Sequence, residues 1–417
     1  MGTFEFPIDR VREAFPALTE GPEPCPAIFL DNPGGTQVST RVADAVRTAM
    51  LEASSNLGGY FNQSRKSDGL WRNAHEAMAL MLGADSYREI IIGQSMTALT
   101  LHMSRSIGRE LSPGDEIIVT RMDHEGDISP WLHLADDLGL VVKWLPFNPD
   151  TWCIEPEDLQ ALLSDRTRVL ALNYASNLTG SINDVATLSN LAKQSGALVY
   201  VDAVQLAPHR LVDVQQLGCD FLVCSSYKFY GPHLGILWGR SEHLEKLSAY
   251  KVRCATNELP GKFEFGTPQT ELLAGLAETV EYFVWLGNQV ANEDNRRGCI
   301  AAAFKAADQY EGQLTQQFID GLNTLGETTI HGITNSNRLS ERVPTISFTH
   351  SRLQPAVIAE ALGEKGICAW SGHNYAYEPV RHLGLDEHTG VVRIGFAHYN
   401  TVAEVDRTLN VLNGIFN

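Results

Sequence analysis

Seven short apolar runs rich in β-branched residues lie between about residues 88 and 240, where they alternate with amphipathic segments. Continuous apolar runs of this length are typical of strands buried on both faces, as in a mostly parallel sheet. Parallel strands need crossover connections, and amphipathic segments such as the helix predicted at 184–196 can supply them. The sequence therefore predicts an α/β fold with a mostly parallel mixed sheet and flanking helices. The predicted strands are 89–93, 116–120, 140–145, 168–174, 197–203, 220–226 and 235–239.

The pattern changes after residue 240. A long stretch with helical periodicity covers 271–324, and 327–417 has the pattern of a β-α-β-β-α unit. We therefore expect a large domain over residues 41–270 and a smaller C-terminal α/β domain over 271–417. Residues 1–40 are expected to pack against both domains.

The charge balance restricts the class of partner. The 417 residues include 32 Lys+Arg against 50 Asp+Glu, which gives a formal net charge of −18. Binding to a phosphate backbone needs clustered cations, so the composition disfavours nucleic acid and anionic membrane and favours a small molecule.

The cysteines and the N-terminus bear on location. Seven scattered cysteines without a C-x-x-C pair predict reduced thiols and no metal site. The first residues do not have the pattern of a secretion signal, and no run of about eighteen apolar residues occurs. We expect a cytoplasmic protein.

Lys228 and Asp202 carry the most chemical information. Lys228 follows a predicted strand in SSYKFYGPHLG, and Asp202 ends the strand LVYVD. Ligands of open α/β sheets bind at the carboxyl ends of strands. A carboxylate there can keep a pyridinium nitrogen protonated, and a neighbouring lysine can form an imine with an aldehyde. Taken singly, Asp202 fits a cap or turn and Lys228 a solvated charge, but their order and spacing favour pyridoxal 5′-phosphate as cofactor.

A candidate phosphate site lies in GQSMTALTLHM, residues 93–103, which follows a strand and opens a helix. Backbone N–H groups and hydroxyls at a helix N-terminus bind anions, so Gln94, Ser95 and Met96 are candidate phosphate ligands. An ordinary N-cap formed by Ser95 or Thr97 is the alternative.

Four motifs in order give the chain a resemblance to a known family. YVDAVQ, SSYKFYGPHLG, FEFGTP and VRIGFAHYNT resemble the fold type I pyridoxal-phosphate enzymes, specifically the class V aminotransferase and cysteine desulfurase group. The resemblance extends from residue 29 to residue 409. It implies that Lys228 is the Schiff-base lysine, that Asp202 contacts the ring nitrogen and that Gln205 donates to the ring oxygen.

The resemblance implies further cofactor contacts. His124 would stack on the pyridine ring, where the alternative is a core or surface histidine, and Asn177 would contact the ring oxygen. Ser226 and Tyr227 would add hydroxyls to the phosphate site, although the family more often has His at the position of Tyr227. Thr267 would reach the phosphate of the neighbouring subunit, which implies a homodimer with shared active sites.

Arg393 is the expected substrate anchor. Its guanidinium can bind an α-carboxylate by two parallel hydrogen bonds, and it occupies the motif of the family's substrate-carboxylate arginine. Asn32, Gly34 and Gly35 in DNPGGT are expected to line the substrate side.

The chain departs from the desulfurase pattern at Tyr375. Desulfurases of this group place a nucleophilic cysteine shortly before the arginine strand, commonly in S/T-G-x-x-C, and the corresponding stretch here is SGHNYA, residues 371–376. Tyr375 stands at the cysteine position and would line the substrate pocket, act as an acid or simply pack. Cys368, in the predicted strand ICAW, is expected to be a buried apolar residue. A persulfide on this loop is therefore not expected.

These features predict a pyridoxal-phosphate enzyme that acts on an amino acid, with Lys228, Asp202 and His124 as catalytic residues. Elimination of a β-substituent, as in a C–S lyase, is the first expectation. An epimerase like isopenicillin N epimerase and a thiol-independent cysteine desulfurase are the alternatives. A catalytically silent binding homologue is a further class, which the intact Lys228, Asp202 and Arg393 disfavour.

Overall fold

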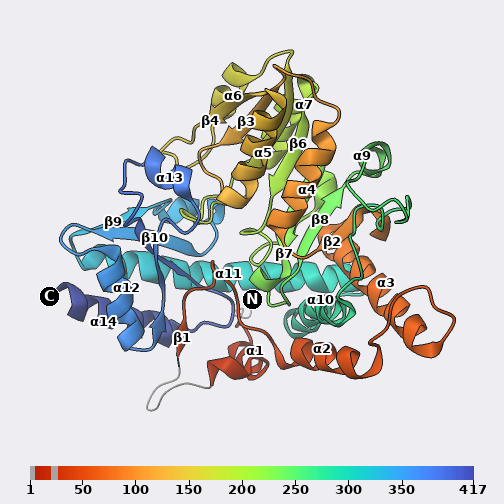
Figure 1. The fold of residues 1–417 in the computed structure, drawn as a ribbon. Coiled ribbons are helices and arrows are strands. Elements are labelled where there is room, and N and C mark those ends of the chain that lie inside the picture. The colour runs from red at the N-terminus through yellow and green to blue at the C-terminus, as the bar shows by residue number, and fades with distance from the viewer. Residues whose placement is uncertain (1–4, 20–26) are drawn as a thin grey trace.

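A computed structural model describes residues 5–19 and 27–417, and its centre is a seven-stranded sheet (Figure 1). The strand order is β2-β8-β7-β6-β5-β3-β4. Strand β8 is antiparallel to its two neighbours, and all the other pairings are parallel. Each predicted apolar run forms one strand, so the predicted mixed sheet is confirmed. The strands are β2 (Ile90–Gly93), β3 (Glu116–Thr120), β4 (Val141–Leu145), β5 (Thr167–Asn173), β6 (Leu198–Asp202), β7 (Phe221–Ser225) and β8 (Gly235–Gly239).

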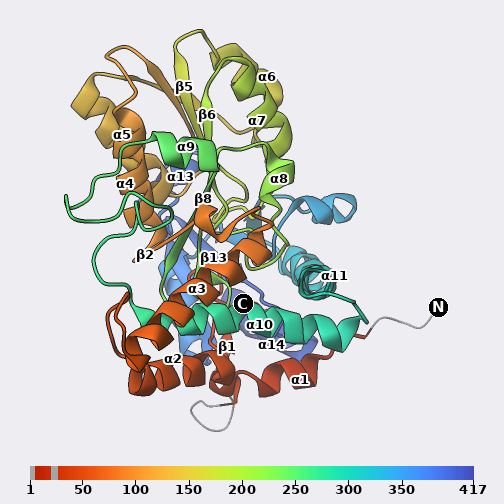
Figure 2. The same cartoon turned by 90° about the vertical axis from the view of Figure 1, so that its right-hand side faces the viewer.

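Helices cover both faces of this sheet (Figure 2). In β6, Val199 and Val201 belong to one apolar cluster and Tyr200 to another, because successive side chains of a strand point to opposite faces. Leu188 joins the first cluster from one side, and Trp131 joins the second from the other. The helices of this region are α3 (Asn62–Leu82), α4 (Met96–Gly108), α5 (Glu125–Leu138), α6 (Pro156–Leu162), α7 (Val185–Gln194), α8 (Val214–Leu217) and α9 (Ser241–Lys246).

Local signals fix the ends of α7 as predicted. The Asp184 side chain accepts a hydrogen bond from the Thr187 amide at 3.1 Å and so caps the helix. Beyond the last turn, Gly196 adopts a φ of +78°, which is open to glycine at little cost and ends the helix.

The C-terminal region contains a separate four-stranded antiparallel sheet in the order β12-β13-β10-β9. The element order from β9 to α14 is β-β-α-β-β-α-β-α, so the predicted β-α-β-β-α order lacked two strands and the short helix before the last strand. The predicted strand ICAW is divided: Ile367–Cys368 pairs with Ile28–Phe29 in a small parallel sheet, and Trp370 begins another strand. The elements are β1 (Ile28–Phe29), β9 (Thr328–His331), β10 (Thr345–His350), α12 (Pro355–Glu364), β11 (Ile367–Cys368), β12 (Trp370–Gly372), α13 (Tyr377–His382), β13 (Val391–Gly395) and α14 (Val402–Phe416).

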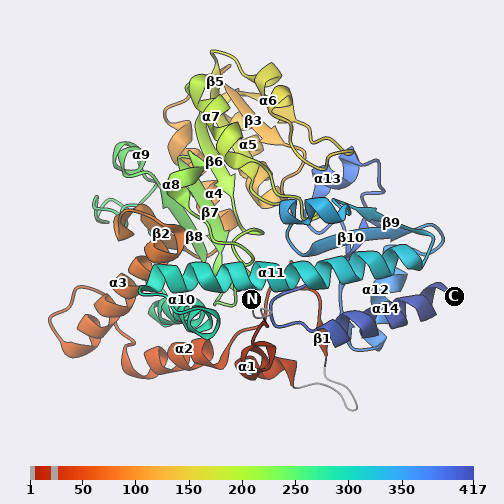
Figure 3. The same cartoon turned by 180° about the vertical axis from the view of Figure 1, so that it is seen from behind.

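The predicted helical stretch 271–324 consists of two helices, α10 (Thr270–Val290) and α11 (Arg296–Thr324). Asn295 starts the second by accepting a hydrogen bond from the Gly298 amide at 2.8 Å. α10 packs on α2 (Thr40–Glu52) and α3, whereas α11 runs across the back of the molecule to α14 (Figure 3). Helix α10 therefore lies against helices of the large-sheet region, although the predicted boundary places it in the C-terminal domain. The domain bounds stay a prediction. Within 5–19 and 27–417, no helix is both long and apolar enough to cross a bilayer.

The N-terminal segment touches both sheet regions. Arg12, in α1 (Ile8–Glu13), pairs with Glu404 of α14 at 2.9 Å. Phe15 packs edge-on against Tyr230, which follows β7, and against Tyr282 of α10. The segment thus lies where residues from the two regions meet.

Candidate active site

A pocket opens where β5, β6 and β7 end, beside the first turn of α4. Asn173 and Asp202 end neighbouring strands as register partners, and Ser225 ends the next strand. The structure thereby brings together most of the residues that the sequence predicted. The lining residues are Ser95, Met96, Thr97, His124, Asn173, Ala175, Asn177, Asp202, Val204, Gln205, Ser225, Tyr227 and Lys228.

Lys228 projects from the short turn that follows β7. Its ammonium nitrogen donates to the carbonyl oxygens of Pro33 and Gly34, the latter at 3.1 Å. Burial, and next the positive charge of Arg393, lowers the pKa of Lys228 to about 7, while Asp202 acts in the opposite direction. A substantial fraction of the amine is therefore neutral at neutral pH, which is the form that attacks a carbonyl carbon.

Asp202 offers a buried anion to the pocket. Only 5% of the residue is exposed, and its Oδ1 accepts a hydrogen bond from the Val204 amide at 2.8 Å. Burial raises the pKa of Asp202 to about 6, against the Val204 hydrogen bond and the charge of Lys228. The carboxylate is still largely ionised at neutral pH and can bind a cationic N–H group.

His124 presents a neutral ring. It caps α5, and its Nδ1 accepts a hydrogen bond from the Gly126 amide at 2.8 Å, which leaves the proton on Nε2. Burial, followed by the charges of Lys228 and Arg393, lowers the pKa of His124 to about 3. A flat uncharged ring at this place suits the stacking role that the sequence predicted.

The first turn of α4 has free donors. The first N–H groups of a helix have no partner inside it, and the Ser95 hydroxyl accepts that of Ala98 at 3.1 Å. Met96 and Thr97 also line the pocket, and their amides belong to these first N–H groups without a partner inside the helix. A Cβ atom on Gly235 of β8 would lie 2.2 Å from the Ser95 carbonyl carbon. Only glycine therefore allows β8 to pack this closely against the start of α4. Ser95 thus forms the helix cap, and the phosphate-binding role of Ser95 and Met96 stays a prediction.

Arg393 is a buried cation without a carboxylate partner. Its side chain is 5% exposed, Nη1 donates to the Asn177 carbonyl oxygen at 3.0 Å, and Nε has no hydrogen-bond partner. Burial lowers the pKa of Arg393 to about 10, so it stays charged at neutral pH. No ion pair joins it to another described residue. A buried unpaired charge is costly, and an anionic ligand would offset that cost.

Tyr375 stands on a loop with left-handed backbone geometry. Asn374 and Tyr375 have φ angles of +52° and +58°, which are unusual for residues other than glycine. The Asn177 amide donates to the Asn374 carbonyl oxygen, and the Glu125 amide to that of Tyr375, each at 2.8 Å. The Tyr375 ring is 67% exposed and stacks on His124 with centroids 5.4 Å apart. The loop is therefore fixed to the pocket at two points.

Two predicted residues have other tasks in the structure. Asn32 was predicted to line the substrate side, but its amide donates to Gly395 and Asn400 at 2.8 and 3.1 Å, and its Oδ1 accepts from Tyr399. A further bond from this amide reaches the Phe29 carbonyl oxygen at 3.0 Å, so the side chain holds its own loop together and fixes it to the C-terminal region. Ser226 is buried, and its hydroxyl donates to the Pro232 carbonyl oxygen rather than to the pocket. Ser225 lines the pocket instead.

Gln94 and Thr267 lie apart from the strand-end pocket. Both are exposed and line a neighbouring cavity of about 850 Å³. Gly34 contributes its carbonyl oxygen to Lys228, and Gln205 lines the pocket while its amide donates to the Thr345 hydroxyl at 2.8 Å. Thr267 thus has no contact with the pocket of its own chain, and its predicted role toward a neighbouring subunit stays a prediction.

Sequence reasoning missed Thr97, Asn173 and Ser225 as pocket residues. Asn173 and Ser225 end strands next to that of Asp202, so the strand ends themselves could have indicated them. Thr97 had been weighed only as a helix cap. Its place one residue inside α4 puts its amide at the free end of the helix.

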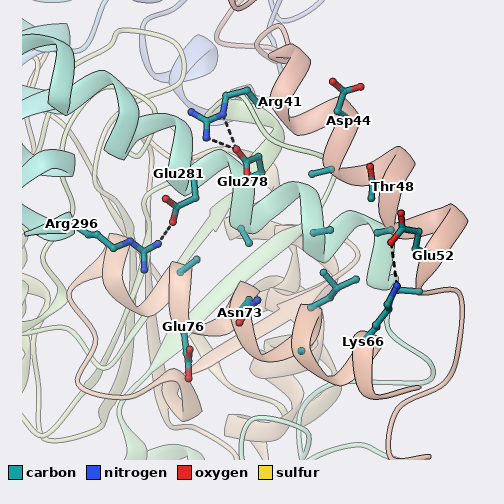
Figure 4. A pocket seen from close by; sticks show the side chains of 18 residues that line it. Arg41, Asp44, Thr48, Glu52, Lys66, Asn73, Glu76, Glu278, Glu281 and Arg296 are labelled. Atoms are coloured by element: carbon teal, nitrogen blue, oxygen red, sulfur yellow. Dashed lines mark hydrogen bonds and ion pairs between the residues drawn. The ribbon is translucent and has the colours of Figure 1, made fainter. Parts of the chain in front are cut away.

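A larger groove lies elsewhere, between α2, α3 and α10 (Figure 4). It encloses about 900 Å³, but its cations pair with its own carboxylates: Arg41 with Glu278, Arg296 with Glu281 and Lys66 with Glu52. The three pairs leave these cations of the groove without a free charge for an anionic ligand. Chemistry, rather than size, identifies the strand-end pocket as the candidate active site.

Comparison with known proteins decides the family. Residues 28–408 match the model of the aminotransferase class-V family. The chain belongs to this family. An aminotransferase-like protein of Gibberella zeae is 33% identical over 99% of each chain, and a probable cysteine desulfurase of Halalkalibacterium halodurans is 29% identical over 95% of each. Among solved structures, a cysteine desulfurase from Thermococcus onnurineus NA1 is similar, with a TM-score of 0.87 and 26% sequence identity. The match covers 100% of this chain and 99% of that chain.

Class-V aminotransferases and their desulfurase relatives depend on pyridoxal 5′-phosphate, and this chain is an enzyme of that kind. The pocket residues fit the group. The free amides of Met96 and Thr97 match a phosphate, the Asp202 carboxylate matches a protonated ring nitrogen, and the partly neutral Lys228 matches an aldehyde.

The cysteines are the remaining candidates for a sulfur acceptor in this class-V enzyme. The described cysteines are all free, and Cys25 lies outside the described residues. Cys368 is half-buried, rather than buried as predicted, because it lies in a two-residue strand at an edge. Burial and the charge of Asp31 raise the pKa of Cys368, which lowers its thiolate content.

Proposed function

We propose that this enzyme eliminates the β-substituent of an amino acid, most simply by cleaving the C–S bond of cysteine or a related substrate. The proposal rests on three observations: Lys228 and Asp202 line one pocket, Arg393 donates to the backbone of its lining residue Asn177, and the loop 371–376, which contacts Asn177 and His124, carries Tyr375 where desulfurases keep a cysteine. Acid–base groups are present, but the usual sulfur acceptor is absent from that loop.

The cofactor has a place in this proposal. Ser95, Met96 and Thr97 would hold its phosphate, Asp202 its ring nitrogen, and His124 would cover one ring face. Bound pyridoxal 5′-phosphate would supply an aldehyde for the substrate amine and a ring that withdraws electrons from the α-carbon.

The chain's own groups would perform the proton transfers. Arg393 would hold the α-carboxylate by two hydrogen bonds and so orient the substrate. The neutral amine of Lys228 would take the α-proton, the electrons of that C–H bond would form a Cα–Cβ double bond, and the Cβ–S bond would break toward sulfur. The sulfur takes up a proton, and the released aminoacrylate takes up water to give pyruvate and ammonia.

Desulfuration to alanine is the second candidate, because several relatives are named cysteine desulfurases. Here sulfur would pass to an external thiol, since the loop of residues 371–376 has no cysteine. Epimerisation remains the third outcome, in which the α-carbon is reprotonated on the opposite face.

A product panel separates these reactions. The enzyme is incubated with cysteine and other β-substituted amino acids, and the products are identified by mass spectrometry. Pyruvate with equal ammonia supports elimination, alanine supports desulfuration, and an inverted α-centre supports epimerisation. Lys228→Ala serves as the control that should yield none of them.

We expect the reaction to be independent of protein thiols. Cys368→Ala should change turnover by less than about twofold, since surface or half-buried substitutions without a chemical role have small effects. Alkylation of accessible thiols should likewise leave turnover intact. A persulfide trapped on Cys368 during turnover, or loss of activity in a folded Cys368→Ala variant, would replace elimination by desulfuration with a displaced nucleophile.

We also expect a homodimer in which Thr267 serves the neighbouring active site. Thr267→Glu should weaken cofactor binding at least about tenfold, because a carboxylate repels a phosphate. The matched test mixes Thr267→Glu chains with Lys228→Ala chains. A mixed dimer contains one site with both residues intact only if Thr267 acts across the interface, so recovered activity supports the prediction. No recovery from demonstrably mixed dimers would show that each chain builds its own site.

A further inference from the structure

Behind Asp202, two more buried carboxyl groups converge. Asp123 and Asp127 are each 1% exposed, at the residue before the α5 cap and in its first turn. The two carboxyl groups are close enough that each shifts the pKa of the other, and neither has a cation as partner in the described protein. The negative charge of Asp202 also raises the pKa of both groups, so all three carboxyl groups lie near one another.

The cluster has too few donors for three carboxylates. Thr120 donates to one oxygen of Asp123. The other oxygen of Asp123 and both oxygens of Asp127 are buried without a donor in the described protein. The indole N–H of Trp131 lies beside Asp127 but makes no hydrogen bond of good geometry. The two carboxyl groups could satisfy each other by a hydrogen bond only if one of them carried a proton.

The surrounding charges favour that proton. Burial, and the negative charge of Asp202, raise the pKa of Asp123, and the charges of both neighbours do the same for Asp127. The other titratable groups near Asp202 are Lys228 and Tyr227 from the turn after β7, Cys224 from β7, Tyr200 from β6 and His124 from α5. Lys228 is the cation among them, and it acts on Asp202 from the pocket side.

We propose that Asp123 and Asp127 share one proton and act as positioning residues for Asp202, placing one negative charge behind the carboxylate that faces the ring nitrogen. The pair would raise the proton affinity of the Asp202 and ring-nitrogen unit and so keep the ring protonated. The shared proton depends only on the chain itself, while its effect on the ring nitrogen rests on the proposed function.

The shared proton can be tested on the enzyme without cofactor. Infrared spectroscopy at neutral pH is expected to show a protonated carboxyl band that is lost in Asp127→Asn, because the amide can donate to Asp123 and make its proton unnecessary. Asp123→Asn should lose the same band, which keeps the test open if one variant folds poorly. Asp136→Asn, at an exposed position of the same helix, is the matched control and should keep it.

A stability measurement gives the same test a second readout. A carboxyl group with a raised folded pKa stabilises the protein at low pH, and this stability is lost as the pH rises through the folded pKa. Wild-type Tm should therefore fall with rising pH over that range, and Asp127→Asn should show a smaller fall. Identical carboxyl bands and identical slopes in wild type and Asp127→Asn would overturn the shared proton.

The effect on the ring nitrogen is measured by binding rather than turnover. Wild type should prefer pyridoxal 5′-phosphate to its analogue with carbon in place of the ring nitrogen. Asp127→Asn keeps one ionised carboxylate and should keep this preference, whereas the double variant Asp123→Asn with Asp127→Asn loses the negative charge of the pair and should reduce the preference about tenfold. An unchanged preference in the double variant would refute the positioning role even with the shared proton intact. If the chain binds neither compound, the proposed function fails while the infrared result still stands.

Discussion

Replacement of Lys228 by Ala is expected to reduce turnover at least about ten-thousandfold, because the variant loses both its covalent attachment point and its general base. Borohydride treatment of wild type with bound cofactor should leave the pyridoxyl group on Lys228, found by peptide mapping. Lys262, which donates to the carbonyl oxygens of Leu244 and Glu245, is the control lysine and should carry none. A label on another lysine would remove Lys228 from its assigned role.

The lowered pKa of Lys228 adds a pH dependence to this prediction. The neutral amine is the attacking form, so the rate at which the cofactor-free enzyme takes up pyridoxal 5′-phosphate should rise as the pH increases through about 7. An ordinary lysine would show this rise near pH 10. Stopped-flow absorbance over this pH range measures the rate directly.

Arg393→Lys is expected to lower kcat/KM about a hundredfold or more. Lysine keeps the charge but cannot make two parallel hydrogen bonds to a carboxylate, and each charge-assisted bond is worth about 1.5–3 kcal/mol. Arg393→Ala should lose more. The decisive comparison uses a substrate whose α-carboxylate is replaced by an amide, for which wild type and Arg393→Lys should differ little. An equal loss for both substrates would indicate that Arg393 supports the fold instead.

The large sheet could be predicted because its strands are buried on both faces, so their apolar runs are continuous and unambiguous. The candidate cofactor residues at its strand ends followed from the same pattern, since Asp202 and Lys228 stand where apolar runs stop. The division of ICAW could not be predicted, because β11 pairs with β1, a two-residue strand more than three hundred positions away.

The errors at the site have a similar origin. The Asn32 side chain is held by Gly395, Tyr399 and Asn400, which no local pattern connects with it. Ser225 and Ser226 differ by one position at the end of a strand, where the chain enters a turn and the alternation of faces stops. The spacing of Asp123 and Asp127 was visible as one face of a helix start, but their burial against Asp202 depends on how α5 packs on the sheet.

The two ends of the proposed substrate are held by different parts of the molecule. Arg393 belongs to the C-terminal sheet, whereas Lys228 and Asp202 follow strands of the large sheet, and α11 runs between the two regions (Figure 3). In the proposed reaction, the angle of the α-hydrogen to the Lys228 amine would therefore be set by the alignment of these two sheets. Substitutions in the packing between these sheets, far from any reacting atom, would then act as changes in substrate selectivity before they act as losses of stability.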